Sequence, residues 1–473
     1  MTEMCDIAVI GAGPAGANAA LVASRHGLTV TLLDEQPKPG GQVWRAKSAA
    51  ILDAPSTPES VAGGQLRQHL QNSAVTHLGD SRVWQIEQSA DGWVLHLLRH
   101  GQVPSLRARA LVIATGAREF VQPVPGWTTP GVLGLAGATA LFKQELALPG
   151  KRTVVSGTGP LVFFVAAEIR RLGGEVAAVI TPNSRGDWLR ALPAMARRPD
   201  LLMRGARWVA DLMLAGVPVH WRHAVSEVEG NNNVKTVRFR KLGADWSPKA
   251  EARSVEADSL CLGNGLIPAV ETAQLAGLAL EHRPALGGWV PKRGADGETA
   301  VPGLFLCGDG AGIRGAASAE IDGQLAGLGA AQHLGAETAA ERARLRPSYT
   351  RAARFGMAMT ALSIPRKGLA KLTRDDTIVC RCESLTYGAI AAEIAGGAAS
   401  TNAVKSGLRA GMGACGGKFC QSTVARMIAQ AEGGNEADVP PPTARPPLRP
   451  VPVAALAGDF DYSDLPIPKP APL

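Results

Sequence analysis

The chain has 473 residues, of which 46% are hydrophobic and 19% are charged. This length predicts about three domains, and this balance of residues excludes a disordered chain. The formal net charge of +8 comes from scattered arginines without a dense basic run, which argues against binding to nucleic acid. We find no secretory signal and no run of about 18 uncharged apolar residues, so we expect a cytoplasmic protein without a transmembrane segment.

A strand–helix–strand pattern opens the chain. Residues 5–10 form an apolar strand, an alanine-rich helix follows, and a second strand over residues 28–33 ends at Asp34 and Glu35. The loop between the first strand and the helix reads G-A-G-P-A-G and contains Gly11, Gly13, Pro14, Ala15 and Gly16. This order of elements is typical of a dinucleotide-binding unit. The alternative is a glycine-rich turn without a ligand.

Each part of this unit has a physical reason. Gly11 permits a tight turn, Gly13 lets the backbone approach a pyrophosphate, and Gly16 allows the helix to pack closely on the strand. The N-terminus of the helix presents free N–H groups and the positive end of its dipole to the phosphates. Asp34 lies 18 positions after Gly16, where a carboxylate accepts hydrogen bonds from a ribose, and Glu35 is the adjacent candidate.

A second glycine-rich loop, P-G-G-Q-V-W-R, follows the acidic pair and includes Gly41, Gln42 and Arg45. Its position predicts a loop that passes close to a cofactor, and the alternative is an ordinary glycine turn. Beyond it, the residue pattern predicts a helix over residues 59–72 and strands over residues 81–88, 92–99 and 108–113.

Residues 151–183 repeat the strand–helix–strand pattern with the loop G-T-G-P-L-V. Gly157 and Gly159 stand at the first two glycine positions, but Val162 replaces the third glycine. The second strand ends at Thr181 without an acidic residue, so the ribose of NAD would lack its usual acceptor. We expect a second nucleotide-binding unit and leave three alternatives for its ligand, namely NAD(P), ATP or ADP, and none.

The remaining segments carry weaker signals. An apolar strand runs into Gly308 and Asp309, where the carboxylate is suited to hold the polyhydroxyl chain of a cofactor, and the alternative is a helix N-cap. Residues 337–375 predict a basic helical linker that packs on these domains or on a partner, or that is simply solvated. The proline density of residues 433–473 excludes a helix and predicts an extended strap or a disordered tail.

Four of the seven cysteines form two close pairs. Cys380 and Cys382 are followed, after 32 residues, by Cys415 and Cys420. Four thiolates at this spacing suit one metal centre, and the residues alone allow a structural zinc or a 2Fe–2S cluster. Metal-free thiols are the other alternative. An odd number of cysteines without a secretory signal also predicts a reducing compartment.

Together, these motifs resemble a known family. G-A-G-P-A-G, P-G-G-Q-V-W-R, A-T-G-A-R-E and P-G-L-F-L-C-G-D-G-A-G resemble the pyridine nucleotide–disulfide reductase superfamily. The segment from C-R-C-E to G-M-G-A-C-G-G-K-F-C resembles the bacterioferritin-associated-ferredoxin type of 2Fe–2S domain, which favours an iron–sulfur cluster over zinc. In this order, over about residues 4–430, the chain is similar to the large or A subunits of opine oxidases, hydrogen cyanide synthase and hydroxyproline dehydrogenases.

The resemblance implies an α/β fold with two Rossmann-like dinucleotide-binding domains and a small helical four-cysteine iron–sulfur domain. The expected segments are an FAD domain in two parts (1–150 and 266–336), a second nucleotide domain (151–265), the linker (337–375), the cluster domain (376–432) and the proline-rich tail (433–473). This division is typical of a chain that carries electrons between two cofactors.

The resemblance also implies roles for individual residues. The glycine loop and Asp34 would hold the pyrophosphate and ribose of FAD, and Gly41, Gln42 and Arg45 would lie beside the flavin. Val83 would present its backbone to the adenine. The phosphate region and the ribityl chain would contact Thr115, Gly116, Gly308 and Asp309. The cluster would be ligated by Cys380, Cys382, Cys415 and Cys420.

Such a chain would be one subunit of an amine or amino-acid dehydrogenase complex. A smaller flavoprotein subunit, similar to glycine or sarcosine oxidase, would oxidise the C–N bond of the substrate, and this chain would pass the electrons to an acceptor. Further expectations are a small ferredoxin-like third subunit, FMN at a subunit interface, and peripheral contact with the inner face of the membrane.

Departures from the superfamily leave alternatives open. The redox-active cysteine pair of disulfide reductases is missing, so disulfide reduction is not expected. The degenerate second glycine motif argues against NAD(P)H as donor, and no histidine–carboxylate pair marks a general base. One alternative is a self-contained NAD(P)H-dependent FAD/iron–sulfur reductase that delivers electrons to a carrier protein. The other is a noncatalytic scaffold.

Overall fold

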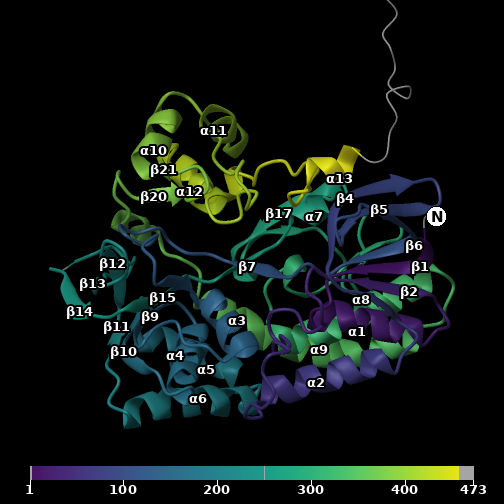
Figure 1. The fold of residues 1–473 in the computed structure, drawn as a ribbon, viewed down its shortest axis with the longest axis horizontal. Helices are drawn as coiled ribbons and strands as arrows, with labels where there is room; N and C mark the ends of the chain where they lie inside the picture. Colours follow the sequence, from purple (N-terminus) through teal and green to yellow (C-terminus); the bar gives the residue numbers. More distant parts are fainter. Residues whose placement is uncertain (1–2, 250, 458–473) are drawn as a thin grey trace, which may run out of the picture.

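The N-terminal glycine loop lies at the carboxyl end of the first strand in the first sheet. The computed structural model describes residues 3–249 and 251–457. The strand order is β3-β2-β1-β6-β5-β4, with β19 paired to β6 (Figure 1). The strands are β1 (Glu3–Ile10), β2 (Val30–Leu33), β3 (Thr76–Leu78), β4 (Ser81–Ser89), β5 (Gly92–Arg99), β6 (Ser105–Ile113) and β19 (Leu304–Leu306). All pair in parallel except β4 and β5, which form an antiparallel extension.

Two helices of small residues cover one face of this sheet, namely α1 (Pro14–Ser24) and α8 (Ala316–His333) (Figure 1). Gly323 of α8 lies against the backbone of Ala15 in α1, where any larger side chain would collide. This close packing buries aliphatic side chains of β1 and β6 beneath both helices. The helix α2 (Pro58–Gln71), predicted at residues 59–72, is confirmed.

The second sheet is parallel and has the order β11-β10-β9-β15-β8. Its strands are β8 (Val132–Gly134), β9 (Arg152–Gly157), β10 (Glu175–Thr181), β11 (Val219–Trp221) and β15 (Ser259–Gly263). Successive residues of β9 face opposite cores, because Val155 packs toward the helices and Val154 toward a smaller sheet. The structure places β8 in this sheet although it precedes residue 151.

Helices and a three-stranded sheet sandwich the second sheet. The helices are α3 (Leu135–Glu145), α4 (Leu161–Arg171), α5 (Arg185–Met195) and α6 (Pro199–Leu214). The smaller sheet contains β12 (His223–Glu229), β13 (Thr236–Lys241) and β14 (Arg253–Glu256). The two large sheets are joined by the antiparallel pair β7 (Ala117–Glu119) and β16 (Leu266–Pro268). Short elements complete this part, namely α7 (Glu271–Leu275), β17 (Leu280–Arg283), η1 (Pro284–Leu286), β18 (Gly288–Pro291) and η2 (Gly308–Ala311).

The cysteine segment forms a small domain with its own core (Figure 1, upper left). It contains β20 (Ile378–Cys380), β21 (Leu385–Thr386), α10 (Tyr387–Ala395), α11 (Thr401–Leu408) and α12 (Gln421–Ala431). Trp127 reaches this domain from the nucleotide-binding part, because its indole N–H donates to Ile378 O at 2.6 Å. The cation of Arg426 in α12 lies 4.1 Å from the ring centre of Phe120. These contacts dock the cysteine domain beside the link between the sheets.

The linker and the tail both pack on the nucleotide-binding part. The linker forms α9 (Ala339–Ala361), which packs along α8, and then η3 (Lys367–Leu372). The tail runs along β4, where Leu448 N–H donates to Trp84 O at 2.9 Å, as expected for an extended segment. The exclusion of helix from the tail was wrong, since η4 (Glu436–Asp438) and α13 (Val453–Ala457) form, the latter in a proline-free stretch. Residues 458–473 lie outside the described residues.

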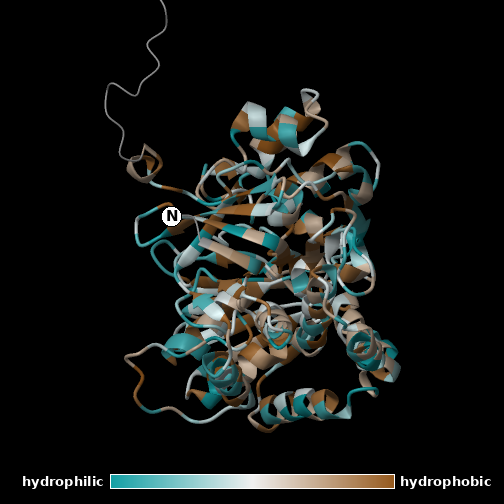
Figure 2. Cartoon of the chain, turned by 90° about the vertical axis from the view of Figure 1, so that its right-hand side faces the viewer, coloured by the Kyte–Doolittle hydropathy of each residue, from teal (hydrophilic) through white to brown (hydrophobic). Residues whose placement is uncertain are grey.

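The apolar residues gather where the sheets and helices meet. In Figure 2, brown segments lie in the middle of the molecule, whereas helices at its edge alternate between brown and teal. This alternation is typical of helices with one buried face. Among residues 3–249 and 251–457, we find no helix with the length and apolar character that a membrane crossing requires.

Candidate functional site

The first glycine loop and the P-G-G-Q loop pack directly against each other, and Gly40 N–H donates to Ala12 O at 2.8 Å. Gly11 has a φ of +101°, and Gly16 lies so close to Gly11 O that a side chain there would collide. Gly13 differs, because the nearest atom to a Cβ built on it is Gly41 Cα at 3.9 Å. Gly41 has a φ of +56°, and a Cβ there would lie 2.8 Å from Gly13 Cα. The loops therefore approach closely and leave the side of Gly13 free.

Asp34 and Glu35, the acidic pair after β2, contact different parts of the chain. Asp34 accepts hydrogen bonds from Ala12 N–H at 2.6 Å and Gln36 N–H at 2.7 Å, and burial raises the pKa of its carboxyl group. It therefore lies at the glycine loop, as predicted. Glu35 instead pairs with Arg449 of the tail at 2.6 Å. Of the two, Asp34 is the one that contacts the glycine loop, and its contact with a ribose stays a prediction.

Polar side chains tie the P-G-G-Q loop to α3. The guanidinium of Arg45 donates to Gln42 and to Gln144, each at 2.8 Å. The ammonium group of Lys143 donates to Val43 O at 2.7 Å, and burial lowers its pKa to about 8. Sequence reasoning missed Lys143 and Gln144, because a single lysine and a single glutamine in a helix carry no motif. They hold the loop that lies beside the expected flavin.

Three further loops close the space around the first glycine loop. Thr115 Oγ1 donates to Ala269 O at 3.1 Å, and Gly116 O accepts from Ala269 N–H at 3.0 Å. A Cβ on Gly308 would lie 2.8 Å from the side chain of Ala15 at the start of α1. The strand ends of β1, β6 and β19 thus meet at one edge, which is where such sheets bind ligands.

Asp309 and Val83 take positions that the predictions only partly describe. Asp309 accepts from Arg314 N–H at 2.9 Å and Gly315 N–H at 3.0 Å, so it caps the loop before α8, and burial raises its pKa. Val83 is buried in β4, where it pairs with Leu97 of β5. Neither observation tests a contact with a cofactor, and both roles stay predictions.

A buried ion pair supports Gly308 and was not predicted. Asp322 of α8 accepts from Gly308 N–H at 2.8 Å and from the guanidinium of Arg293 at 2.9 Å. The side chains are 3% and 7% exposed, so each charge depends on the other. Arg293 also donates to Tyr349 of α9 at 3.0 Å. The linker helix thereby helps to fix the loop at the end of β19.

In the second glycine loop, both glycines lie against other parts of the chain. Gly157 packs directly on Gly263 of β15, so a side chain there would collide with its carbonyl oxygen. A Cβ on Gly159 would collide with Ser363 Oγ, which belongs to the segment after α9. Gly159 N–H donates to Asn183 Oδ1 at 3.1 Å. The predicted second unit is therefore present, and its second glycine, Gly159, has a φ of +70° where Gly13 has −71° and lies against Ser363 of the chain itself.

Glu119 lies beneath the start of α3, beside this second loop. Its carboxyl group accepts from Ala136 N–H at 3.1 Å, and Gly134 and Gly263 have no room for side chains against it. Burial raises the pKa of Glu119 from 4.5 to about 8. Between these pH values the unfolded chain has lost this proton while the folded chain keeps it, so the free energy of unfolding falls as pH rises.

We predict that Glu119→Gln removes this decline. Glutamine has nearly the same shape and still accepts from Ala136, but it cannot ionise. Chemical denaturation between pH 5 and pH 8 should show a wild-type loss of up to about 4 kcal/mol that is absent from the variant. Parallel curves for both proteins over this pH range would contradict the assignment of the proton to Glu119.

The four cysteines contact one another in two pairs. The thiol of Cys420 hydrogen-bonds to Cys380, and the thiols of Cys382 and Cys415 interact in the same way. The bond from Cys420, together with N–H groups of the loop, lowers the pKa of Cys380 to about 5. Within the described ranges no three metal-binding side chains converge on a single ion position. Two thiol pairs suit a cluster with two irons.

The surrounding loop is shaped for these pairs. Gly413 lies so close to Cys382 that a side chain would collide, and Gly411 N–H donates to Cys380. Cys380 and Cys420 are buried, whereas Cys382 is exposed and Cys415 is partly exposed. N–H groups directed at sulfur and one pair near the surface are features of iron–sulfur sites that exchange electrons with other groups.

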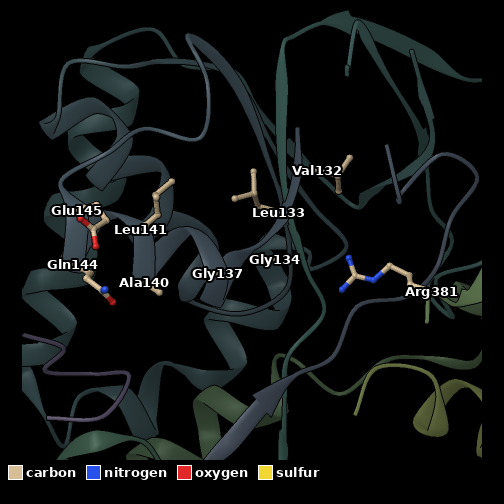
Figure 3. A pocket seen from close by; sticks show the side chains of 9 residues that line it. All are labelled: Val132, Leu133, Gly134, Gly137, Ala140, Leu141, Gln144, Glu145 and Arg381. Carbon is tan, nitrogen blue, oxygen red and sulfur yellow. The ribbon is translucent and has the colours of Figure 1, made fainter. Parts of the chain in front are cut away.

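A cavity lies beside α3 and Arg381 of the cysteine domain. It has a volume of ≈ 390 Å³ and is lined by β8, α3 and Arg381, with the side chains shown in Figure 3: Val132, Leu133, Gly134, Gly137, Ala140, Leu141, Gln144, Glu145 and Arg381. Gln144 belongs to the network of Arg45, and Arg381 stands between two of the cysteines. The cation of Arg381 lies 5.0 Å from the ring centre of Trp127 and 4.7 Å from that of Phe419. The cavity thus lies between α3, which holds the P-G-G-Q loop, and the cysteine domain, but no residue of that loop and none of the four cysteines lines it.

Comparison with known proteins gives two family matches. Residues 5–333 match the family described as pyridine nucleotide-disulphide oxidoreductase. Residues 378–430 match the BFD-like [2Fe-2S] binding domain. These matches agree with the free space at Gly13 and with the two thiol pairs, so the cofactors are FAD and a 2Fe–2S cluster. The zinc alternative is thereby excluded in favour of the cluster.

Relatives extend over nearly the whole chain. The opine oxidase A subunit from Rhizobium meliloti is 32% identical over 97% of this chain and 88% of its own length. The HcnB subunit of hydrogen cyanide synthase from Pseudomonas aeruginosa is 30% identical over 95% of this chain and 97% of its own length. The sarcosine oxidase alpha chain from Corynebacterium sp. is 28% identical, and the match covers 71% of this chain and 33% of that one.

Solved structures agree on the fold. L-proline dehydrogenase from P. horikoshii superposes with a TM-score of 0.73 at 21% identity, over 96% of this chain and 80% of that one. Thioredoxin reductase from T. acidophilum superposes with a TM-score of 0.53 at 20% identity, over 70% of this chain and 98% of that one. The chain belongs to the pyridine nucleotide-disulphide oxidoreductase family and, within it, to the family of opine oxidase A subunits that end in a BFD-like 2Fe–2S domain.

Proposed function

We propose that this chain is the FAD- and 2Fe–2S-containing subunit of a heteromeric amine or amino-acid dehydrogenase. The observation that carries the proposal is the similarity to an opine oxidase A subunit over 97% of the chain, from the first glycine loop through the cysteine domain. The HcnB subunit of hydrogen cyanide synthase and the sarcosine oxidase alpha chain, which are also named as subunits of larger enzymes, support it. The substrate class is an opine, hydroxyproline or a glycine-like amine.

In the proposed reaction a partner flavoprotein oxidises the C–N single bond of the amine to a C=N bond. Two electrons and two protons leave the amine, and this chain passes the electrons to a carrier protein or quinone. FAD accepts electrons in pairs and releases them singly, and a 2Fe–2S cluster carries them one at a time. The chain's own residues bind and orient these groups and exclude water from them.

The residue roles follow the geometry of the two sites. The free side of Gly13, between the two glycine loops, takes the FAD pyrophosphate, and Asp34 accepts from the adenosine ribose. Gly41, Gln42 and Arg45 border the flavin. The remaining predicted contacts are Gly11, Pro14, Ala15, Gly16, Glu35, Val83, Thr115, Gly116, Gly308 and Asp309. Cys380, Cys382, Cys415 and Cys420 ligate the cluster.

The relatives' names as subunits support partner subunits for this chain, and we propose their identity. A smaller glycine- or sarcosine-oxidase-like flavoprotein subunit supplies the substrate pocket, and a small ferredoxin-like subunit is a further candidate. FMN at a subunit interface also belongs to this proposal. The location is cytoplasmic, with peripheral contact to the inner face of the membrane as one variant.

Purification of the complex through a tag on this chain tests the proposal. We expect a second flavoprotein to co-purify and the complex to reduce an artificial electron acceptor when opines, hydroxyproline or N-methylglycine are added. The chain alone should hold both cofactors and oxidise none of these amines. Amine oxidation by the isolated chain, or a complex that is inactive with all of these amines and with glycine, would contradict the proposed function.

A further inference from the structure

The two nucleotide-binding units have the same fold, but in the second unit the chain itself covers the glycine loop where a ligand would bind. In both units, the second glycine of the loop lies where a pyrophosphate approaches the backbone. Gly13 meets nothing nearer than Gly41 Cα at 3.9 Å from its built Cβ. Gly159 meets Ser363 at collision distance. The difference comes from a segment far along the chain, residues 359–366, which we call the strap.

The strap lies across the ends of β9 and β15. Ser363 lies against the chain just after each of these two strands. A Cβ on Gly159 would collide with the hydroxyl group of Ser363. A Cβ on Gly265 would lie 3.0 Å from both the Cβ and the carbonyl oxygen of Ser363. Gly159 follows β9 and Gly265 follows β15. The crevice between these two strand ends is where a sheet of this type binds a dinucleotide.

Asn183 fastens the strap to the glycine loop. This residue follows β10, two positions after Thr181, which stands where Asp34 stands in the first unit. Its Oδ1 accepts from Gly159 N–H at 3.1 Å, and its Nδ2 donates to Leu362 O in the strap at 2.8 Å. Asn183 is 1% exposed. One buried amide therefore uses the N–H that a phosphate would need and holds the strap at the same time.

Arg366 anchors the other end of the strap. Its guanidinium pairs with Asp187 of α5 at 2.7 Å and donates to Ala244 O at 2.7 Å. The same cation lies 5.0 Å from the ring centre of Trp246. Asp187 is itself held by Ser184 at the N-terminus of α5. The strap is thus fixed at both ends to the unit that it covers.

We infer that the strap is a built-in occupant of the second dinucleotide crevice, and that Ser363 and Asn183 determine the electron donor by excluding NADH and NADPH. A pyrophosphate can reach Gly159 only if Ser363 moves away and Asn183 releases both of its hydrogen bonds. Leaving a buried polar group without its hydrogen-bond partner is costly. The same exclusion applies to ATP and ADP, because they also need the backbone at Gly159.

This inference deepens the proposed function and rests on it for the direction of electron flow. If the second crevice takes no nicotinamide, FAD in this chain receives electrons from another subunit. The two statements are tested separately. Binding of NADH tests the strap, and reduction by an amine in the complex tests the function.

The double variant Asn183→Ala/Ser363→Gly opens the crevice. The alanine releases Gly159 N–H and Leu362 O, and the glycine removes the hydroxyl beside Gly159. We expect the association constant for NADH, measured by calorimetry on the full chain, to rise at least tenfold with FAD and cluster content unchanged. Asn232→Ala, the same change in an exposed loop, should leave NADH binding at the wild-type level.

Two results overturn the inference. One is saturable micromolar binding of NADH to the wild-type chain, and the other is a folded double variant that binds NADH no better than wild type. Hydrogen exchange on the wild-type chain gives a test that needs no variant. Peptides covering residues 157–162 should exchange slowly and keep the same rate when millimolar NADH is added. Added protection of these peptides by NADH also overturns the inference.

Discussion

Cys415→Ser should remove the 2Fe–2S cluster from this chain and leave FAD in place. Cys415 pairs with Cys382 on the more exposed side of the centre, and serine is a poor ligand for iron at neutral pH. The cysteine domain has its own core, which does not share side chains with the nucleotide-binding sheets. We expect the iron content to fall at least tenfold, with FAD content unchanged, measured by metal analysis and visible absorption.

Cys5→Ser is the matched control for this change. Cys5 lies in β1, its thiol donates to Arg107 O at 3.6 Å, and a serine hydroxyl can make the same bond. This variant should keep both cofactors. Loss of FAD together with iron in Cys415→Ser would mean that the cysteine domain and the nucleotide-binding part do not form separate cofactor sites.

Gly13→Val should abolish FAD binding without unfolding the chain. A Cβ on Gly13 would make only an ordinary contact, with Gly41 Cα at 3.9 Å, and the residue has an extended backbone conformation that valine adopts readily. The added methyl groups occupy the volume that the pyrophosphate needs. We expect FAD affinity to fall at least a hundredfold, or about 2.8 kcal/mol. Titration of the deflavinated protein with FAD measures this loss.

Two other glycines separate this effect from general damage. Gly64→Val lies in α2 with no atom within 4 Å of the new Cβ, so FAD binding should stay at the wild-type level. Gly16→Val should instead destabilise the fold with or without FAD, because its side chain collides with Gly11 O. Normal FAD occupancy in Gly13→Val would contradict the assignment of the first glycine loop.

Local patterns explain which parts of the molecule could be predicted from the sequence. The first glycine loop, the strands β4 and β5, the helix α2 and the cysteine pairs follow from residue spacing within short segments, and the structure has them where the spacing predicts. Asp34 could be placed at the glycine loop because a strand end fixes its distance from Gly16. These elements need no knowledge of distant contacts.

Long-range contacts explain what could not be predicted. The sequence indicates a degenerate second loop, but nothing near Gly159 indicates that Ser363 lies against it. Asn183 belongs to no motif in the sequence, whereas in the structure it joins the loop to the strap. The bond between Arg449 and Glu35 likewise joins the tail to the first unit. Such pairs leave no periodic pattern in either partner.

The most direct test of the account follows the electrons. The purified complex, with its partner subunit, is mixed anaerobically with an amine that it oxidises, frozen, and measured by electron paramagnetic resonance. We predict the signal of a reduced 2Fe–2S cluster after the amine, and no such signal after NADH or NADPH. A cluster that stays oxidised with the amine, or that NADH reduces within one turnover, would contradict the claim that this chain receives its electrons from an amine-oxidising partner.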